Sequence, residues 1–491
     1  MRPSRLFPVV SLLLLLTACT TNPATGDKSF TAFMSPEQER QIGAQQHSRL
    51  VEEMGGLYPD PALQAYVADV GAKLVRVSET PDLPYTFTIV DTDDVNAFAL
   101  PGGYVHVTRG LLALANSEAE LAGVLAHEIA HVAARHAAER YSRSVAAGLG
   151  AAILGALARA SGLPAGAGDL AALGSQAYLQ SYSRDQELEA DMLGIRYLAE
   201  AGYEPGAMAD FLTNLDNYSR LQAALAGRSA ATAEARGVMA SHPRQADRIA
   251  RASQLAGQTP LADAEAGKDA YLARIDGLIY GDSPEQGLRV GRDFYHRSLR
   301  IAFRVPPGFA VINRPRSVIA RGPEGSLMAL DMVRAPNVPG PAAYILGTWG
   351  GLRLTELDRI EVNGMEGATG AARVQTRGGV ADVRLVAIRA DPPRLYRFVF
   401  LTPPRLTGKL APEMKRTVYS FRRLTEAEAA AVEALRIRVV TVKPGDTARS
   451  LAADMPFADD RLEHFLVLNR IDPDTPLKPG QKVKIVAGGR R

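Results

Sequence analysis

Residues 125–131 read Leu-Ala-His-Glu-Ile-Ala-His, which is the pattern HExxH. They lie in an Ala- and Leu-rich run without proline, residues 117–138, and a Ser-x-x-Glu capping box opens that run. The run predicts a helix on which His127 and His131 are one turn apart, so two imidazoles on one face can hold one zinc ion. Glu128 is rotated by about 100° from that face. We therefore expect Glu128 to act on a metal-bound water as general base without being a ligand.

A second polar run, residues 183–191, carries the carboxylates that complete this site. HExxH zinc enzymes need a third protein ligand and leave the fourth position to water, and a carboxylate from a later helix is one solution. Glu187 and Asp191 lie one turn apart on a common helix face. We predict that Glu187 ligates one Zn²⁺ per chain and that Asp191 accepts a hydrogen bond from a ligand histidine. Glu189 points elsewhere and is predicted to face solvent.

Composition limits the class of protein. The chain has 491 residues, of which 46% are hydrophobic and 22% are charged, and this is typical of a globular protein of about three domains. The net charge is +3 and no basic run stands out except the final two arginines, so the sequence gives no sign of a nucleic-acid partner. A single cysteine excludes an intrachain disulfide.

The N-terminus indicates the compartment. Two arginines precede an apolar run, residues 9–16, which is too short to span a bilayer and has the form of a signal peptide. The following Leu-Thr-Ala-Cys, residues 16–19, resembles the lipobox of bacterial lipoproteins, which implies lipid attachment at Cys19. Thr20, not Asp, follows it, which in Gram-negative lipoproteins implies an outer-membrane anchor. We expect an outer membrane lipoprotein facing the periplasm; the alternative is a soluble periplasmic protein with an incidental Cys19.

Residues 96–107 read as two short strands around a Pro-Gly-Gly turn, directly before the HExxH helix. An exposed strand edge there could bind an extended peptide substrate by main-chain pairing. The alternative is an ordinary hairpin in the core sheet. The candidate substrate-edge residues are Asn96, Ala97, Phe98, Ala99, Pro101, Gly102 and Gly103.

Residues 20–250 resemble the gluzincin family of prenyl-protein endopeptidases and bacterial heat-shock metallopeptidases. The shared elements are Asn-Pro-Ala-Thr-Gly at 22–26, Asn-Ala-Phe-Ala at 96–99, Pro-Gly-Gly at 101–103, HExxH at 127–131, and Ser183-Arg184 with Glu187 and Ala190-Asp191. The resemblance implies the same zinc ligands, the same base and the same supporting Asp191. The chain lacks the multispanning helices of the integral members, so the match is to the soluble, periplasmic chaperone-protease branch.

Two further residues enter through this resemblance. The periplasmic branch carries a His-Pro loop whose histidine can occupy the open zinc position and hold the enzyme latent. This implies that His242, which precedes Pro243, is a fourth ligand in a latent state; the alternative is a surface turn histidine. Arg248 is a candidate oxyanion stabiliser, with a structural salt bridge as the alternative. The residues assigned to structure alone are His106, Arg135 and His136.

The C-terminal part carries a second resemblance. Val-Thr-Val-Lys-Pro-Gly-Asp-Thr at 440–447 and Leu-Lys-Pro-Gly-Gln-Lys-Val at 477–483 resemble the LysM module, a βααβ unit that binds N-acetylglucosamine chains of peptidoglycan. Ala448 departs from the larger aliphatic residue usual in that family, which bears on glycan binding more than on fold. Peptidoglycan is therefore a candidate partner, and a module that only packs or binds protein is the alternative.

The predicted fold class is α+β: a mainly helical zincin-like metallopeptidase domain with a small edge-exposed sheet, a small α+β domain, and a C-terminal βααβ module. The predicted segments are 1–18 (signal peptide), 19–34 (tether), 35–263 (zinc metallopeptidase domain), 264–424 (small α+β domain of unknown ligand), 425–437 (connector helix) and 438–487 (LysM-like domain).

The predicted function is a zinc-dependent endopeptidase of the bacterial envelope. Its expected substrates are misfolded or stalled envelope proteins, and chaperone activity stays open as a second role. The alternative is a non-catalytic scaffold tethered to lipid and peptidoglycan. An intact Glu128 and a complete ligand set favour the enzyme, because a scaffold has no need of them.

Overall fold

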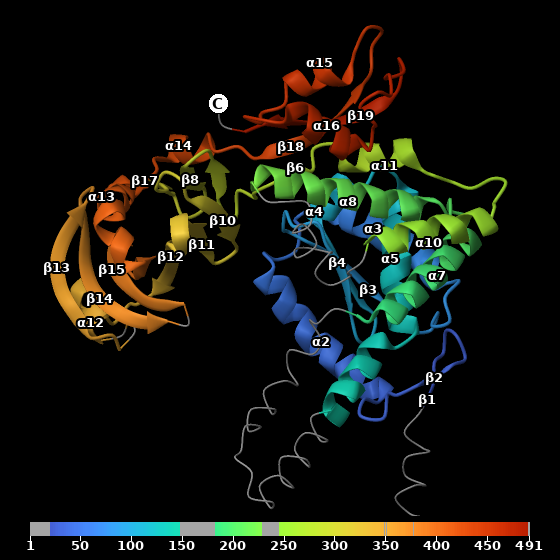
Figure 1. Ribbon diagram of the computed structural model, residues 1–491, viewed down its shortest axis with the longest axis horizontal. Coiled ribbons are helices and arrows are strands. Elements are labelled where there is room, and N and C mark those ends of the chain that lie inside the picture. Colours follow the sequence, from blue (N-terminus) through green and yellow to red (C-terminus); the bar gives the residue numbers. More distant parts are fainter. Residues whose placement is uncertain are drawn as a thin grey trace, which may run out of the picture. The chain divides into compact units, whose positions relative to one another are not determined.

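The computed structural model describes residues 20–147, 182–227, 245–347, 349, 351–376 and 378–489 (Figure 1). They form two compact units. The first unit comprises residues up to Leu278 together with Ile437–Ala487, and the second comprises Ile279–Arg436 with the last residues of the chain. Among the described residues, every helix falls short of the length and apolar character needed to cross a bilayer.

The first unit is mainly helical. Its helices are α2 (Pro36–Glu53), α3 (Pro61–Val75), α4 (Arg109–Leu114), α5 (Glu118–Ala133), α7 (Arg184–Glu200), α8 (Ala207–Leu225), α10 (Gln245–Gln258), α11 (Lys268–Ile275), α15 (Ala448–Ala453) and α16 (Arg461–Asn469). Its strands are β1 (Thr20–Thr21), β2 (Lys28–Ser29), β3 (Thr86–Val90), β4 (Ala97–Leu100), β5 (Tyr104–Thr108), β18 (Leu435–Thr441) and β19 (Lys482–Gly488).

Helix α5 is the centre of this unit. The Ser117 side chain caps it by accepting a hydrogen bond from the backbone N–H of Glu120. The other half of the predicted capping box differs, because the Glu120 side chain accepts from the backbone N–H of Asn116 and not from that of Ser117. Nearly every residue of α5 is buried, and α3, α7 and α8 pack around it. Small residues allow a close approach of α7: a Cβ added to Gly194 would lie only 3.2 Å from the backbone nitrogen of His127. The small residues therefore set the distance between α5 and α7.

A three-stranded sheet lies beside α5, in the order β3-β5-β4. Strand β5 pairs parallel with β3 and antiparallel with β4, in a register that places Ala97 opposite Val107 and Leu100 opposite Tyr104. The turn between β4 and β5 uses positive φ angles at two glycines, which side chains would strain. Within the described residues β4 has a neighbouring strand on one side only, so the predicted hairpin is present and β4 is a sheet edge.

The second unit is mainly β-structure. Its strands are β6 (Ile279–Tyr280), β7 (Leu288–Val290), β8 (Asp293–His296), β9 (Ile301–Arg304), β10 (Ala310–Arg314), β11 (Ser317–Arg321), β12 (Leu327–Arg334), β13 (Leu354–Val362), β14 (Met365–Thr376), β15 (Gly379–Asp391), β16 (Arg394–Thr402) and β17 (Arg422–Arg423). Its helices are η4 (Pro323–Gly325), α12 (Pro341–Gly347), α13 (Pro404–Ser420) and α14 (Glu426–Ala430).

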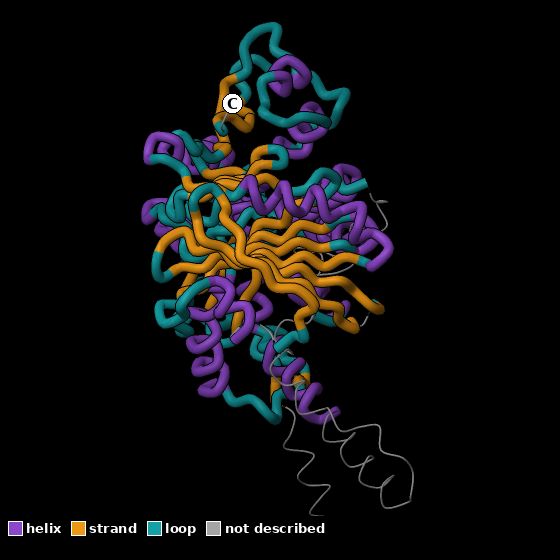
Figure 2. The backbone as a smooth tube through the Cα atoms, turned by 90° about the vertical axis from the view of Figure 1, so that its left-hand side faces the viewer, coloured by secondary structure: helices purple, strands orange, loops and turns teal. Residues whose placement is uncertain are grey.

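Seven of these strands form an antiparallel sheet in the order β10-β11-β12-β16-β15-β14-β13, and its strands run side by side in Figure 2. Helix α13 packs on one face, where Phe398, Phe400 and Met414 are buried together. Helix α12 packs on the other face, against a cluster that includes Tyr344 and Leu385. Burial of both faces explains why the strands carry apolar residues in both orientations. The α+β class is confirmed.

The C-terminal module has the predicted order βααβ, namely β18, α15, α16 and β19. The Asn469 side chain ties α16 to β19, because it donates to the backbone carbonyl of Lys484 and accepts from the N–H of the same residue. The predicted connector helix over 425–437 is shorter in the structure. Helix α14 ends at Ala430, and β18 begins at Leu435, where the β-branched run of the module starts.

The border between the units also differs from the predicted one. Residues 264–278, which the sequence analysis placed in the second domain, belong to the first unit. The reason is α11: Tyr271 is fully buried, and its hydroxyl donates to the backbone carbonyl of Leu112 at 2.6 Å. This contact joins α11 to the end of α4, and no local sequence pattern specifies it.

A buried lysine anchors the C-terminal module within the first unit. The Lys484 ammonium is fully buried and donates to the backbone carbonyls of Ala113, Leu114 and Ala115 at 2.8, 3.1 and 2.6 Å. The last carbonyls of a helix have no partner inside the helix, so the ammonium satisfies the C-terminus of α4. Burial lowers the pKa of Lys484, and the negative charge of Glu120 opposes that shift. The module thereby holds the segment that leads into α5.

We expect Lys484→Met to lower the free energy of unfolding by about 2–4 kcal/mol, because the buried carbonyls of Ala113 and Ala115 lose the ammonium donor, whereas that of Leu114 keeps two side-chain amide donors. Urea unfolding followed by circular dichroism at pH 7 measures this. The matched control is Lys482→Met, since Lys482 is partly exposed and forms an ion pair with the exposed Asp269. That control should change stability by less than about 0.5 kcal/mol. Equal midpoints for both variants would show that Lys484 does not anchor the module.

Candidate metal centre

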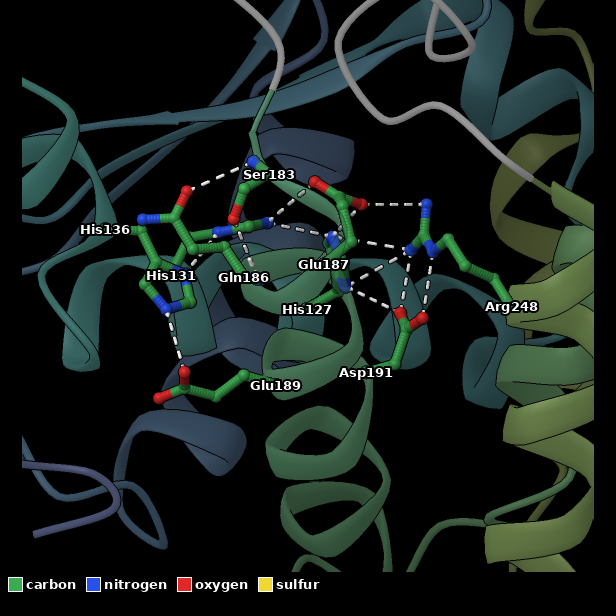
Figure 3. A network of polar contacts seen from close by, with 9 residues as sticks. All are labelled: His127, His131, His136, Ser183, Gln186, Glu187, Glu189, Asp191 and Arg248. Carbon is green, nitrogen blue, oxygen red and sulfur yellow. Dashed lines mark hydrogen bonds and ion pairs between the residues drawn. The ribbon is translucent and has the colours of Figure 1, made fainter. Parts of the chain in front are cut away.

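Three buried side chains converge between α5 and α7: His127, His131 and Glu187 (Figure 3). The two histidine Nε2 atoms lie 3.0 Å apart. Each Nε2 atom lies 3.6 Å from a carboxylate oxygen of Glu187. Ligands at about 2.0–2.2 Å from a tetrahedral zinc ion are about 3.3–3.5 Å apart, so these separations suit one ion. Two imidazoles and one carboxylate are also the donor set of catalytic zinc sites, and the residues present therefore fit zinc.

Asp191 orients the first histidine. Its Oδ1 atom lies 2.9 Å from Nδ1 of His127, on the side of the ring that faces away from the cluster. A carboxylate at this position holds the proton on Nδ1 and leaves the Nε2 lone pair directed at the metal position. The contact is the one that the spacing of Glu187 and Asp191 on one helix face predicts, although its role in metal binding stays a prediction.

Arg248 of α10 binds the carboxylates from the opposite side. Its Nε and Nη2 atoms donate to the two oxygens of Asp191 at 2.8 and 2.7 Å, and Nη1 lies 3.0 Å from Glu187. Burial alone raises the pKa of Asp191, but the charge and hydrogen bonds of Arg248, together with the bond to His127, outweigh burial and hold that pKa far below its usual range. This geometry is that of a structural ion pair. The role of Arg248 as an oxyanion stabiliser stays a prediction.

Glu128 faces the small cavity on the His127 side of α5. The carboxylate is buried, and Glu128 lines this cavity together with His127, Asp191 and Ala97. The cavity has a volume of about 30 Å³, which is enough for a water molecule. A carboxylate, a ligand histidine and room for one water are thus adjacent, which is what a general base beside a metal requires.

Strand β4 borders the site on both sides. Ala97 lines the small cavity, whereas Ala99, Pro101 and Gly102 line a second cavity of about 210 Å³ that reaches His131. The other candidate edge residues have partners inside the sheet. The Asn96 carbonyl accepts from the backbone N–H of Thr108, and the Asn96 N–H donates to the Thr108 hydroxyl. Phe98 stacks on His106, and the Gly103 carbonyl accepts from the N–H of Thr86. The hairpin is therefore part of the core sheet, and some of its residues also border the site. Substrate binding at its edge stays a prediction.

Two residues that the sequence did not connect with the site contact His131, and two more lie behind them. Tyr182 stacks on its ring with centroids 3.8 Å apart, and burial raises the pKa of Tyr182 to about 12. His136 lies on the Nδ1 side of His131. Glu189, predicted to face solvent, accepts a hydrogen bond from Asn22 and lies within ion-pair distance of His136. The Glu189 side chain is 26% exposed, so the prediction holds only in part, because Asn22 from the chain before α2 and His136 from the chain after α5 cover the rest of it.

The two other residues assigned to structure alone make structural contacts. His106 is fully buried, and its Nε2 lies 2.9 Å from Nδ1 of His47. Burial lowers the pKa of His106 to about 3. Arg135 forms an ion pair with Glu39 at 3.0 Å and donates to the carbonyl of Met34. Neither residue contacts the three clustered side chains through any interaction given for the described residues. Cys19 and His242 lie outside the described residues, so their predicted roles stay predictions.

We expect Asp191→Asn to lower the free energy of unfolding of the metal-free protein by about 3 kcal/mol, because the buried Arg248 loses one of its two partner charges and keeps only Glu187. The affinity for zinc should fall about 10- to 100-fold as His127 loses its orienting carboxylate. Urea unfolding and competition with a chelator measure the two effects. The control is Asp247→Asn on the same helix as Arg248, where an exposed pair with Arg184 contributes little. A stability of Asp191→Asn equal to that of the control would contradict the assignment.

Comparison with known proteins agrees with this geometry. The family model described as Peptidase family M48 matches residues 61–256, and the LysM domain model matches residues 440–486. The beta-barrel assembly-enhancing protease of Escherichia coli (strain K12) is 30% identical over 282 residues, which is 54% of this chain and 55% of that protein. The protein of the same name from Yersinia pestis is 35% identical over 196 residues, covering 38% of this chain and 40% of that protein.

A eukaryotic relative also matches part of the chain. The mitochondrial metalloendopeptidase OMA1 of Schizosaccharomyces pombe is 34% identical over 155 residues, which is 31% of this chain and 43% of that protein. The chain spans about half the length of the curated bacterial relatives it matches. M48 metallopeptidases are zinc-dependent, in accord with the two histidines and one glutamate that converge here. Residues 61–256 therefore belong to Peptidase family M48, and residues 440–486 form a LysM domain.

Proposed function

We propose that the chain is a zinc-dependent endopeptidase in which Glu128 is the general base. The observation that supports it most is the convergence of His127, His131 and Glu187 beside a buried Glu128 and a cavity with room for one water. A scaffold without catalytic activity would not need to bury a carboxylate next to two imidazoles, because burial of a charged group is costly.

Zinc held at this site would supply Lewis acidity, which acidifies a water molecule and polarises a peptide carbonyl. The residues of the chain do the rest. Glu128 takes the proton from the attacking water and passes it to the nitrogen of the departing amine. Asp191 keeps the proton of His127 on Nδ1, and Arg248 holds the carboxylates of Asp191 and Glu187 in place. Strand β4 offers backbone groups to an extended substrate beside the cluster.

Glu128→Gln should retain zinc and lose endopeptidase activity, since the amide cannot accept the proton of water. The expected loss of casein cleavage is about 10²- to 10⁴-fold, the usual contribution of a general base. Metal content of the purified protein is measured alongside the rate. The wild type treated with a chelator should lose the same activity and regain it with added zinc. Wild-type rates in Glu128→Gln would remove Glu128 from this role, and a zinc-loaded wild type without cleavage would favour the scaffold.

The substrate class and location are further parts of this proposal. The names of the Escherichia coli and Yersinia pestis relatives point to a protease in beta-barrel assembly, which supports misfolded or stalled envelope proteins as substrates here. The LysM match supports peptidoglycan as a partner. Chaperone activity is proposed as a second role. The lipobox-like Leu-Thr-Ala-Cys at 16–19 supports an outer-membrane anchor at Cys19 and a periplasmic location.

The anchor is tested by growing cells with radiolabelled palmitate. The wild-type protein should incorporate the label, and Cys19→Ala should not.

The latent state proposed for His242 has a direct test. If His242 occupies the position of the attacking water at rest, His242→Ala should raise cleavage of an unfolded substrate several-fold at unchanged zinc content. Initial rates on casein measure the effect. His47→Ala, at a histidine on α2 that pairs with His106, is the control and should leave the rate unchanged. Equal rates for wild type and His242→Ala would refute latency through this residue.

A further inference from the structure

We propose that His136, Glu189 and Asn22 form a positioning chain that holds His131 in the orientation needed for metal binding. The inference rests on the zinc site of the proposed function and assigns it three residues beyond the ligands, the base and Asp191. The four side chains form one connected line of polar contacts that starts at His131 and ends at the segment before α2.

The first contact fixes which nitrogen of His131 is available. Nε2 of His131 faces His127 and Glu187, whereas Nδ1 lies 2.8 Å from Nδ1 of His136. A histidine that ligates through Nε2 carries its proton on Nδ1 and donates it. Nδ1 of His136 is therefore the acceptor, and the proton of His136 sits on Nε2. Only this arrangement of protons makes the His131–His136 contact favourable while His131 ligates a metal.

The second and third contacts orient His136. Its Nε2 atom lies 3.5 Å from Oε2 of Glu189, which is an ion-pair distance without hydrogen-bond geometry. The other oxygen of Glu189 accepts a hydrogen bond of 2.6 Å from the side-chain amide of Asn22. His136 and Asn22 are both buried, and this restricts their rotation. The Glu189 carboxylate is thus held by Asn22 through one oxygen and faces His136 with the other, so the His136 ring lies between Glu189 and His131.

A local backbone feature brings His136 to this position. Residues five apart on a continuous helix point about 140° away from each other, so His136 could not contact His131 if α5 continued. Helix α5 ends at Ala133, and Arg135 has a positive φ of 57°. The Arg135 side chain is bound to Glu39 and to the Met34 carbonyl, which stabilises this turn. The interruption turns the His136 ring back onto His131.

Both ligand histidines are therefore oriented on Nδ1, but by different groups. His127 contacts Asp191 directly, whereas His131 reaches Glu189 through an imidazole. Figure 3 shows the two systems on opposite sides of Glu187, with His136 between His131 and Glu189 on one side and Arg248 bound to Asp191 on the other. Helix α7 supplies the ligand carboxylate and both orienting carboxylates. The orientation of both imidazoles consequently depends on the position of this one helix.

The test compares two variants of the full chain. His136→Leu removes the acceptor, and we expect a zinc dissociation constant about 10- to 100-fold higher, measured by competition with a chelator. His136→Asn places an amide oxygen where Nδ1 was, so it should restore most of the affinity. Loading with Co²⁺ gives a second readout, because a changed ligand orientation alters the visible absorption spectrum of the bound ion. A spectrum and affinity like those of the wild type in His136→Leu would overturn the proposal.

The chain offers a matched control. His106 is as buried as His136 and also pairs with a second histidine, but in the contacts given for the described residues it does not reach the metal ligands. His106→Leu should lower thermal stability and leave zinc affinity unchanged. An equal loss of affinity in His106→Leu and His136→Leu would mean that both act through stability alone, and the proposal would fail.

If His136→Leu does not fold, Glu189→Gln takes its place, with an expected loss of about 3- to 10-fold in zinc affinity, below the range for a residue in direct contact with the ligand. Unchanged affinity in Glu189→Gln would also overturn the proposal. These zinc-affinity measurements test the positioning chain separately from the endopeptidase activity. A wild type that binds zinc without cleaving peptides would refute the endopeptidase and leave the positioning chain standing.

Discussion

The close packing of α7 on α5 is the constraint on which the rest of the first unit depends. The two helices can approach because Gly194 has no side chain where α7 meets the backbone of His127. At this distance the Glu187 carboxylate reaches both imidazoles, and Asp191 reaches Nδ1 of His127. A side chain at Gly194 would press on the Met208 side chain and on the backbone of His127, so a larger residue there would disturb the contact that sets the ligand positions.

This packing carries an electrostatic cost, and the structure contains the groups that offset it. Two buried carboxylates, Glu187 and Asp191, lie close together and repel each other. Arg248 contacts both of them with a charge that is itself buried. The ion pair therefore makes the metal-free arrangement tolerable, while a bound divalent cation would add to the positive charge facing Glu187. A buried network of this kind is stable only when each of its members has a partner.

The elements around α5 hold it at its two ends. At the N-terminal end, Lys484 of the LysM domain binds the carbonyls that precede the helix. At the C-terminal end, the turn at Arg135 is bound to α2 and brings His136 back to the site. A helix that carries two metal ligands is thus held by segments from both ends of the described chain. Contacts at both ends restrict rotation of α5 about its axis, which would move the two imidazoles away from Glu187.

The sequence by itself determined the local parts of this site. HExxH on a helix places His127 and His131 on one face because the spacing equals one helical turn, and the same reasoning pairs Glu187 with Asp191. Only the tertiary structure decided which side chains meet across segments. The prediction for Glu189 holds only in part because helical periodicity gives an angle around α7 and no information about the chain that covers it. The contact of Lys484 with α4 was likewise invisible, since it joins residues distant in sequence. Local geometry follows from neighbouring residues, whereas these contacts depend on how the whole core packs.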